Sequence, residues 1–147
     1  MKQILVPQGT VNILPYTYLQ SFAATTVVFP KTLINIGRNA FQACTNLDNV
    51  EIPTTVKSIG RRAFSMCKHL KNIKIPQSVT SIEPYAFEDC TDLEAITMPP
   101  VYSLDFNVFS GCENLKEVNV SKFTLFDEEG LKAILPGIKV NRYDRKG

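Results

Sequence analysis

The stretch from Pro30 to Met98 repeats one 23-residue unit three times: PKTLINIGRNAFQACTNLDNVEI (30–52), PTTVKSIGRRAFSMCKHLKNIKI (53–75) and PQSVTSIEPYAFEDCTDLEAITM (76–98). Proline opens each copy, and Pro99 opens a fourth. Self-similarity at a fixed period of this size is the signature of a stacked repeat architecture, because one such unit cannot bury its own apolar face. The repeat therefore predicts a solenoid.

The spacing of apolar residues within the unit predicts its local structure. Each copy ends in an L-x-x-L-x-L pattern, such as Leu70, Ile73 and Ile75, whose last residues alternate as in a strand with one buried face. The segment AFSMC (63–67) upstream has helical spacing but is too short for more than one or two turns. Each repeat is expected to be one short strand, a turn and one short helical or 3₁₀ piece.

Degenerate copies flank the clear ones, so we expect residues 1–147 to form a single repeat domain. Residues 1–29 hold degenerate N-terminal repeats, in which Tyr18 stands at the position of Phe41. Residues 30–120 hold four repeats of 22–23 residues, and a one-residue deletion in the fourth brings Phe109 and Cys112 forward. Atypical terminal repeats are expected, because one face of each lacks a neighbour.

Residues 121–147 depart from the period and are interpreted as a C-terminal cap. Asp127 can cap a helix whose first turn carries the acidic residues 128–129. Pro136 and Gly137 should end this helix, and a last strand with a short, mobile basic tail from Arg142 should follow. The predicted apolar stripe of the helix is Leu131, Ile134 and Leu135.

Composition restricts the function classes. The chain has 16 Lys and Arg against 14 Asp and Glu, which argues against a nucleic-acid binder. No apolar run approaches the roughly 18 residues of a membrane span. The start, MKQILVPQGT, lacks the apolar core of a signal peptide. The localisation stays open: cytoplasmic if the chain is complete, cell surface or secreted if a leader was removed.

The four cysteines follow the repeat, which argues against a zinc site with C-x-x-C spacing. We interpret Cys44, Cys67, Cys90 and Cys112 as small apolar residues at one inward position, with disulfide bonds between neighbours as the alternative. His69 is the only histidine and is interpreted as a polar turn residue. The sequence shows no phosphate-binding loop or nucleophile elbow, so no enzyme activity, metal or cofactor is predicted.

Two further columns are expected to support the stack. One is an unbroken inward ladder of aromatic rings formed by Phe41, Phe64, Phe87 and Phe109. The other is a column of hydroxyl groups three residues after each strand, formed by Thr32, Thr55 and Ser78, which should bond backbone groups of adjacent coils and stop at Val101.

The consensus x-P-x-x-V-x-x-I-x-x-x-A-F-x-x-C-x-x-L-x-x-I-x-I resembles the BspA-type leucine-rich repeat. The resemblance is close over residues 30–98, reaches 120 with one deletion, and continues weakly to about 4 and 140. It implies an α/β solenoid: a right-handed stack with a parallel β-sheet on the concave side and short helical or 3₁₀ segments on the convex side. It also implies roles in protein or host-surface recognition within cell-surface or secreted chains.

The outward strand residues would form the concave face, which is the predicted partner-binding surface. Its residues are Val28, Asp48, Asn49, Glu51, Lys71, Asn72, Lys74, Glu94, Thr97, Glu117 and Asn119. Charges alternate in sign from coil to coil, with Glu51 opposite Lys74, because residues one period apart are neighbours. These charges either pair mainly with one another or form a polar recognition surface.

We therefore expect a non-enzymatic scaffold that binds a protein or peptide through the concave face or the ends of the solenoid. The alternatives are a structural or self-assembling repeat module, or a segment of a cell-surface adhesin. Aromatic residues cluster near both ends and can supply a patch for homo-oligomers. These residues are Tyr16, Tyr18 and Phe22 at the start, and Tyr102, Phe106, Phe123 and Phe126 near the close.

Overall fold

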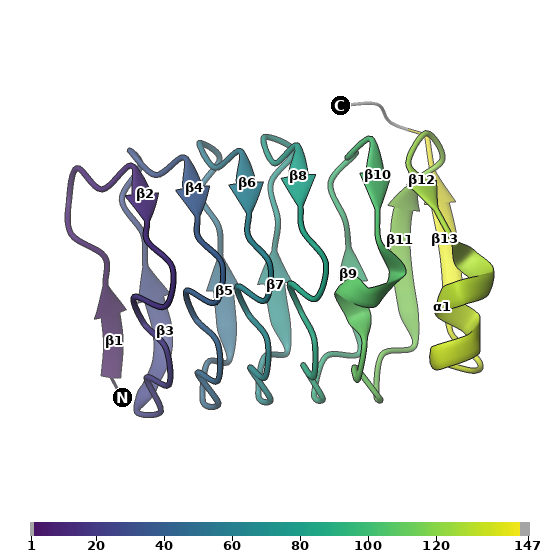
Figure 1. Ribbon diagram of the computed structural model, residues 1–147, viewed down its shortest axis with the longest axis horizontal. Helices are drawn as coiled ribbons and strands as arrows, with labels where there is room; N and C mark the ends of the chain where they lie inside the picture. Colours follow the sequence, from purple (N-terminus) through teal and green to yellow (C-terminus); the bar gives the residue numbers. More distant parts are fainter. Residues whose placement is uncertain (1, 145–147) are drawn as a thin grey trace.

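The computed structural model describes residues 2–144 and shows a parallel β-solenoid of about six turns. The coils lie side by side along the long axis, and each contributes a longer strand to one side and a two-residue strand to the opposite side (Figure 1). We call these two sides the long-strand face and the short-strand face. The handedness and the curvature inferred from the family resemblance remain predictions.

The long-strand face is built from β1 (Lys2–Leu5), β3 (Ala24–Val28), β5 (Asn49–Glu51), β7 (Asn72–Lys74), β9 (Ala95–Thr97), β11 (Glu117–Ser121) and β13 (Lys139–Tyr143). The short-strand face is built from β2 (Asn12–Ile13), β4 (Asn35–Ile36), β6 (Ser58–Ile59), β8 (Ser81–Ile82), β10 (Ser103–Leu104) and β12 (Leu125–Phe126). A 3₁₀ helix, η1 (Phe106–Phe109), and one α-helix, α1 (Glu128–Ile134), complete the described elements.

The strand pairing differs from the single continuous sheet implied by the resemblance. The short strands form a second set of parallel ladders, β2-β4-β6-β8 and β10-β12. The long strands form three separate ladders, β1-β3, β5-β7 and β9-β11-β13. The long-strand face is therefore interrupted twice, between β3 and β5 and between β7 and β9.

The prediction of a short helical piece in each repeat at 30–98 is wrong, because these segments are consecutive turns. Along these turns, successive backbone N–H groups alternate between two kinds of acceptor. One is a carbonyl group of the same coil, as when the Gln42 N–H donates to Asn39. The other is a carbonyl group of the next coil, as when the Phe41 N–H donates to Ala63 at 2.8 Å. An α-helix uses its interior N–H groups internally and could not make these bonds between coils. Only the fourth repeat, shortened by one residue, has the expected 3₁₀ helix, η1, which Asp105 caps.

The turns require a left-handed backbone at two places per coil. The non-glycine residues with positive φ are Tyr16, Gln20, Asn39, Ala43, Arg62, Met66, Tyr85 and Asp89. Such a conformation costs an L-residue roughly 1–2 kcal/mol. Its repetition at the same positions shows that the bonds between coils dictate the backbone geometry.

The aromatic ladder is confirmed in part. Rings stack from Tyr18 to Phe41 at 5.3 Å, from Phe41 to Phe64 at 5.3 Å, and from Phe64 to Phe87 at 5.7 Å. Phe109 is fully buried, but no ring contact joins it to Phe87 within residues 2–144. The predicted last step, from Phe87 to Phe109, is therefore wrong, and the break coincides with the shortened fourth repeat that contains η1.

The thiol column is structural. All four cysteines are free and buried, and each Sγ donates to an aromatic residue's carbonyl in the preceding coil, as Cys67 does to Phe41 at 3.2 Å. Burial raises the pKa of the Cys44, Cys67 and Cys90 thiols. The interpretation as small inward residues is confirmed over the disulfide alternative.

The hydroxyl column is also confirmed. Thr32, Thr55 and Ser78 donate to carbonyl groups of the preceding coil at 2.6–2.8 Å. Contrary to expectation, the column resumes after Val101, because Thr124 donates to the Val101 carbonyl at 2.6 Å. These bonds tie successive coils together near their upper turns.

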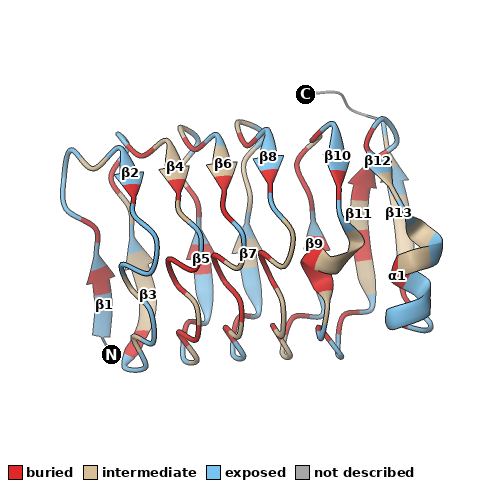
Figure 2. Cartoon of the chain, viewed as in Figure 1, coloured by how far each residue is buried: buried red, intermediate tan, exposed pale blue. Residues whose placement is uncertain are grey.

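The C-terminal segment forms the last coil. Asp127 caps α1 through the Gly130 N–H, as predicted, and Leu131 and Leu135 are buried, but Ile134 is exposed. The prediction that a mobile tail begins at Arg142 is wrong, because Arg142 lies in β13 and its Nε donates a hydrogen bond to Glu128 at 2.8 Å. Residues 145–147 of that tail lie outside the described residues. Figure 2 shows buried residues recurring at equivalent places along the coils.

Candidate recognition surface

The predicted binding residues all lie on or beside the long strands, on the outward side. Val28, Asp48, Asn49, Glu51, Lys71, Asn72, Lys74, Glu94 and Thr97 are exposed, and Glu117 and Asn119 are half-buried. The central outward column continues beyond these residues at both ends. Leu5 pairs in register with Val28, and Asn141 pairs with Asn119. The predicted columns did not include them, because Leu5 lies in a degenerate N-terminal repeat and Asn141 lies in the segment interpreted as a C-terminal cap.

The chemical character of this central column changes along the solenoid. It is apolar at Leu5 and Val28 and charged at Glu51 and Lys74, and it then carries Thr97, Asn119 and Asn141. Residues one coil apart lie on neighbouring strands about 4.8 Å apart. A partner lying along the solenoid axis would therefore meet apolar, ionic and hydrogen-bonding groups in that order.

The charged part of the face is in register but not ion-paired. The strand pairing sets Glu51 beside Lys74, as predicted. Within residues 2–144, no ion pair shorter than 4.0 Å joins any two of Asp48, Glu51, Lys71, Lys74 and Glu94. The geometry thus leaves these charges open to solvent or to a partner.

The polar part of the face is already hydrogen-bonded. The Asn119 amide donates to Thr97 Oγ1 at 2.9 Å, and the Asn141 amide donates to Asn119 Oδ1 at 2.8 Å. This amide ladder fixes the side chains over three adjacent strands. Fixed side chains lose less conformational entropy when a partner binds.

Two open depressions join into one groove along the face. The first, of about 660 Å³, runs over β5, β7 and β9, and the second, of about 410 Å³, extends towards β13. They share Ile75, Thr97 and Asn119. The groove therefore crosses successive coils.

The floor of the groove is apolar where the sheet is interrupted between β7 and β9. Ile73 and Ile75 are half-buried there, whereas Val50 and Ile96, which occupy the Ile73 column in the adjacent coils, are buried. An apolar floor with polar groups around it is the usual composition of a binding depression. The repeat pattern gave no sign of this feature, because Ile73 and Ile75 match the consensus.

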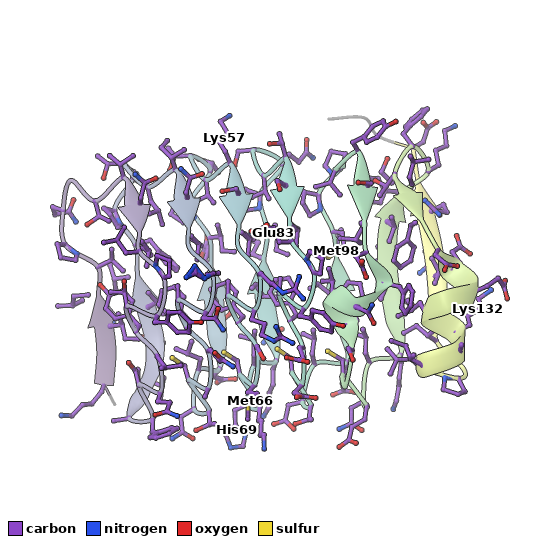
Figure 3. All side chains as sticks on the ribbon, in the orientation of Figure 1. Lys57, Met66, His69, Glu83, Met98 and Lys132 are labelled. Carbon is purple, nitrogen blue, oxygen red and sulfur yellow. The ribbon has the colours of Figure 1, made fainter. Side chains whose placement is uncertain are left out.

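Other chemistry on the molecule is limited. His69 Nδ1 lies 2.9 Å from Asp92 Oδ2 at the lower edge of the solenoid, which agrees with its interpretation as a turn residue (Figure 3). Among residues 2–144, no three His, Cys, Asp or Glu side chains are grouped so that they could hold a metal ion. The helices in that range are too short or too polar to cross a membrane.

The fold and the repeat columns define a leucine-rich-repeat solenoid. The sequence matches the BspA type leucine rich repeat region over residues 11–132, in six copies. The chain therefore belongs to the BspA-type leucine-rich repeat family. No curated protein sequence matched it.

Solved structures with the same fold come from several bacteria. A leucine rich cell surface protein from Faecalibacterium prausnitzii A2-165 is 27% identical, with a TM-score of 0.77 over 90% of this chain and 34% of that one. A leucine-rich repeat protein from Bacteroides ovatus is 25% identical, with a TM-score of 0.62 over 97% and 45%. The Pneumococcal vaccine antigen PcpA is 19% identical, with a TM-score of 0.75 over 97% and 42%, and supports the fold alone. The chain thus spans about a third of the length of the Faecalibacterium protein.

Proposed function

We propose that the chain is a non-enzymatic recognition scaffold that binds an extended protein or peptide segment along the long-strand face. The observation that carries this proposal is the continuous groove over β5–β13, with Ile73 and Ile75 in its floor and unpaired charges beside it. We also infer that the solenoid is right-handed and that this face is its concave side, as the family resemblance implies.

The groove favours an extended partner over a small molecule. Because it is open and crosses several coils, it would enclose a compact ligand poorly but could follow a chain lying along the axis. Lys71 and Lys74 outnumber Glu51 among the charges that line the larger depression. We therefore expect the bound segment to be acidic where it crosses β7.

Location at a cell surface is a second proposal, made for the longer protein of which this chain can be a segment. It is supported by the similarity to the Faecalibacterium cell surface protein. Protease treatment of intact cells of the source organism tests it, since a surface-exposed chain would be degraded while a cytoplasmic marker survives.

The binding proposal is tested with a displayed library of random peptides selected on the immobilised chain. A triple variant, Glu51→Ala, Lys74→Ala and Thr97→Ala, should lose at least about tenfold in affinity for the selected peptides, equivalent to about 1.4 kcal/mol. The matched control, Lys57→Ala, Ser81→Ala and Ser103→Ala, removes exposed polar groups on and beside the short-strand face and should bind normally.

Peptides that bind the long-strand variant as tightly as the wild type would contradict the proposed site. Failure of the library to yield any peptide with measurable affinity would contradict the proposed partner class. Selected peptides enriched in basic rather than acidic residues would overturn the charge preference inferred from Lys71 and Lys74.

A further inference from the structure

Exposed large apolar side chains are confined to the two ends of the solenoid. In the described chain, none lies between Phe29 and Val101. At the N-terminal end they are Leu5, Val11, Leu14, Tyr16, Leu19, Phe22 and Val28. At the C-terminal end they are Tyr102, Phe123, Leu125 and Ile134.

The repeat itself does not require these apolar residues. One period after Leu14, Leu19 and Phe22, the second coil carries Gly37, Gln42 and Thr45. Soluble monomers seldom expose a large contiguous apolar patch without a partner for it. Leu14, Leu19 and Phe22 therefore mark a contact surface at the N-terminal end of the stack, whereas Leu5 and Val28 belong to the long-strand face.

Each end also presents two strand edges. Within residues 2–144, β1 pairs only with β3 and β2 only with β4, while β12 pairs only with β10. The outer edge of β13 from Lys139 to Arg142 has no strand beside it in that range. Unpaired edges are templates for pairing with another chain.

We propose that a second copy of this chain docks head to tail, so that β13 of one copy lies beside β1 of the next and β12 lies beside β2. All coil-to-coil pairing in the described chain is parallel, and translation along the solenoid axis continues both ladders in the same sense. A two-fold contact between two N-terminal ends would instead set β1 antiparallel to its counterpart. The partner for this surface is a second copy of the chain, because β13 and β12 at one end can continue the ladders that begin with β1 and β2 at the other end.

Continuing the observed columns fixes the register of the contact. Lys139 would face Gln3, Val140 would face Ile4, and Asn141 would face Leu5. This register brings no like charges together on the long-strand face. Arg142 is held within its own copy by Glu128 and by the carbonyl groups of Ser121 and Thr124.

Leu14 is placed to make the central contact. A side chain added at Gly37, one period later, would point at the backbone of the preceding coil around Ile13. Leu14 occupies the equivalent position in the first coil, so its side chain points out of the N-terminal end. A side chain fits this column only where the coils stack as they do at Glu83 and Asp105, because an added Cβ at Gly37 or Gly60 would lie too close to backbone atoms of the preceding coil. Leu14 would therefore reach the last coil of the preceding copy.

A head-to-tail contact is heterologous and does not close, so it predicts growth into longer assemblies as concentration rises. Continuing the short-strand columns in the same way sets Leu125 beside Asn12 of the next copy. The test uses Leu14→Asp at one end, Leu125→Asp at the other, and Lys57→Asp as the matched interior control. Lys57 projects from the upper edge of a middle coil, away from both ends (Figure 3). Sedimentation velocity over a wide range of protein concentration is the measurement.

The expected result is association of the wild type and of the Lys57→Asp control, and loss of association in each end variant alone. An equimolar mixture of the two end variants should form a dimer and stop there, because each supplies the intact end that the other lacks. A mixture that stays monomeric overturns the proposal, as does a monomeric wild type. Association retained by one end variant alone indicates a contact between like ends and also overturns it.

A second measurement covers the case in which a charged end variant fails to fold. Single variants Gln3→Cys and Lys139→Cys are mixed and oxidised, since residues facing each other on neighbouring strands lie within reach of a disulfide. The native thiols are buried and do not compete. A disulfide dimer formed only in the mixture supports the contact, whereas disulfide dimers of either variant alone, or none at all, overturn it. The long-strand variants test peptide binding separately, so either proposal can fail without the other.

Discussion

Replacement of Phe64 by alanine tests whether the aromatic ladder carries the stability of the stack. Phe64 is fully buried and stacks on Phe41 at 5.3 Å and on Phe87 at 5.7 Å. Truncation of a buried phenylalanine to alanine costs about 3–5 kcal/mol through lost transfer energy and the cavity that remains. Each ring pair contributes about 0.5–1.5 kcal/mol beyond burial. We therefore expect Phe64→Ala to lower the free energy of unfolding by an amount in the upper part of the range of about 3–5 kcal/mol.

Phe109→Ala is the matched control, because Phe109 is equally buried but has no ring contact with Phe87 in the described structure. It should cost about 1–3 kcal/mol less than Phe64→Ala, the contribution of two ring pairs. Equilibrium denaturation in urea, followed by circular dichroism and by tyrosine fluorescence, gives both free energies of unfolding. A cost below about 1 kcal/mol for Phe64→Ala would refute the inward assignment, and equal costs for the two variants would show that stacking adds nothing.

Three further outcomes are expected. Because burial raises the pKa of Cys67 and Cys90, these thiols should resist iodoacetamide at pH values near their ordinary pKa and react only after unfolding, as mass spectrometry of the labelled protein will show. Burial, followed by the nearby Glu88 carboxylate, raises the pKa of Asp89, so the native state binds this proton more tightly than the unfolded chain does. Asp89→Asn should therefore stabilise the protein at neutral pH, and this advantage should shrink as the pH falls through the folded-state pKa in a series of denaturation curves. Lys74→Ala should change the free energy of unfolding by no more than about 0.5 kcal/mol in the same assay, since the side chain is exposed and makes no ion pair in the described structure.

The sequence predicted which residues face inward, and this part of the fold followed from the repeat. In the four repeats at 30–120, the columns of Phe64 and Cys67 are fully buried and the column of Leu70 is buried. The sequence could not distinguish a short helix from consecutive turns in the same segment. Apolar residues at Ala63, Phe64 and Cys67 fit both structures, and the choice depends on hydrogen bonds to the next coil, such as Phe64 N–H to the Ala86 carbonyl.

The candidate site shows the same limit. Period-two alternation correctly placed Glu51, Lys74 and Thr97 on the outward side. It could not show that the sheet opens between β7 and β9, because the strands on both sides follow the consensus. The predicted end patches named only aromatic residues, of which Tyr102 is highly exposed, and omitted exposed aliphatic residues such as Leu14 and Leu125.

The backbone of the turns explains why the scaffold is so regular while its long-strand face varies. A residue at positive φ, such as Met66, costs roughly 1–2 kcal/mol, and it is retained because its N–H bonds the Glu88 carbonyl of the next coil at 2.7 Å. The inward side chains and every second turn N–H thus depend on the neighbouring coil, which keeps these positions constant. The outward charged residues Glu51 of β5 and Lys74 of β7 make no such contribution to stacking, so they can change without loss of the fold. Substitutions at Glu51 and Lys74 can therefore alter the charge of the long-strand face independently of the stability of the stack.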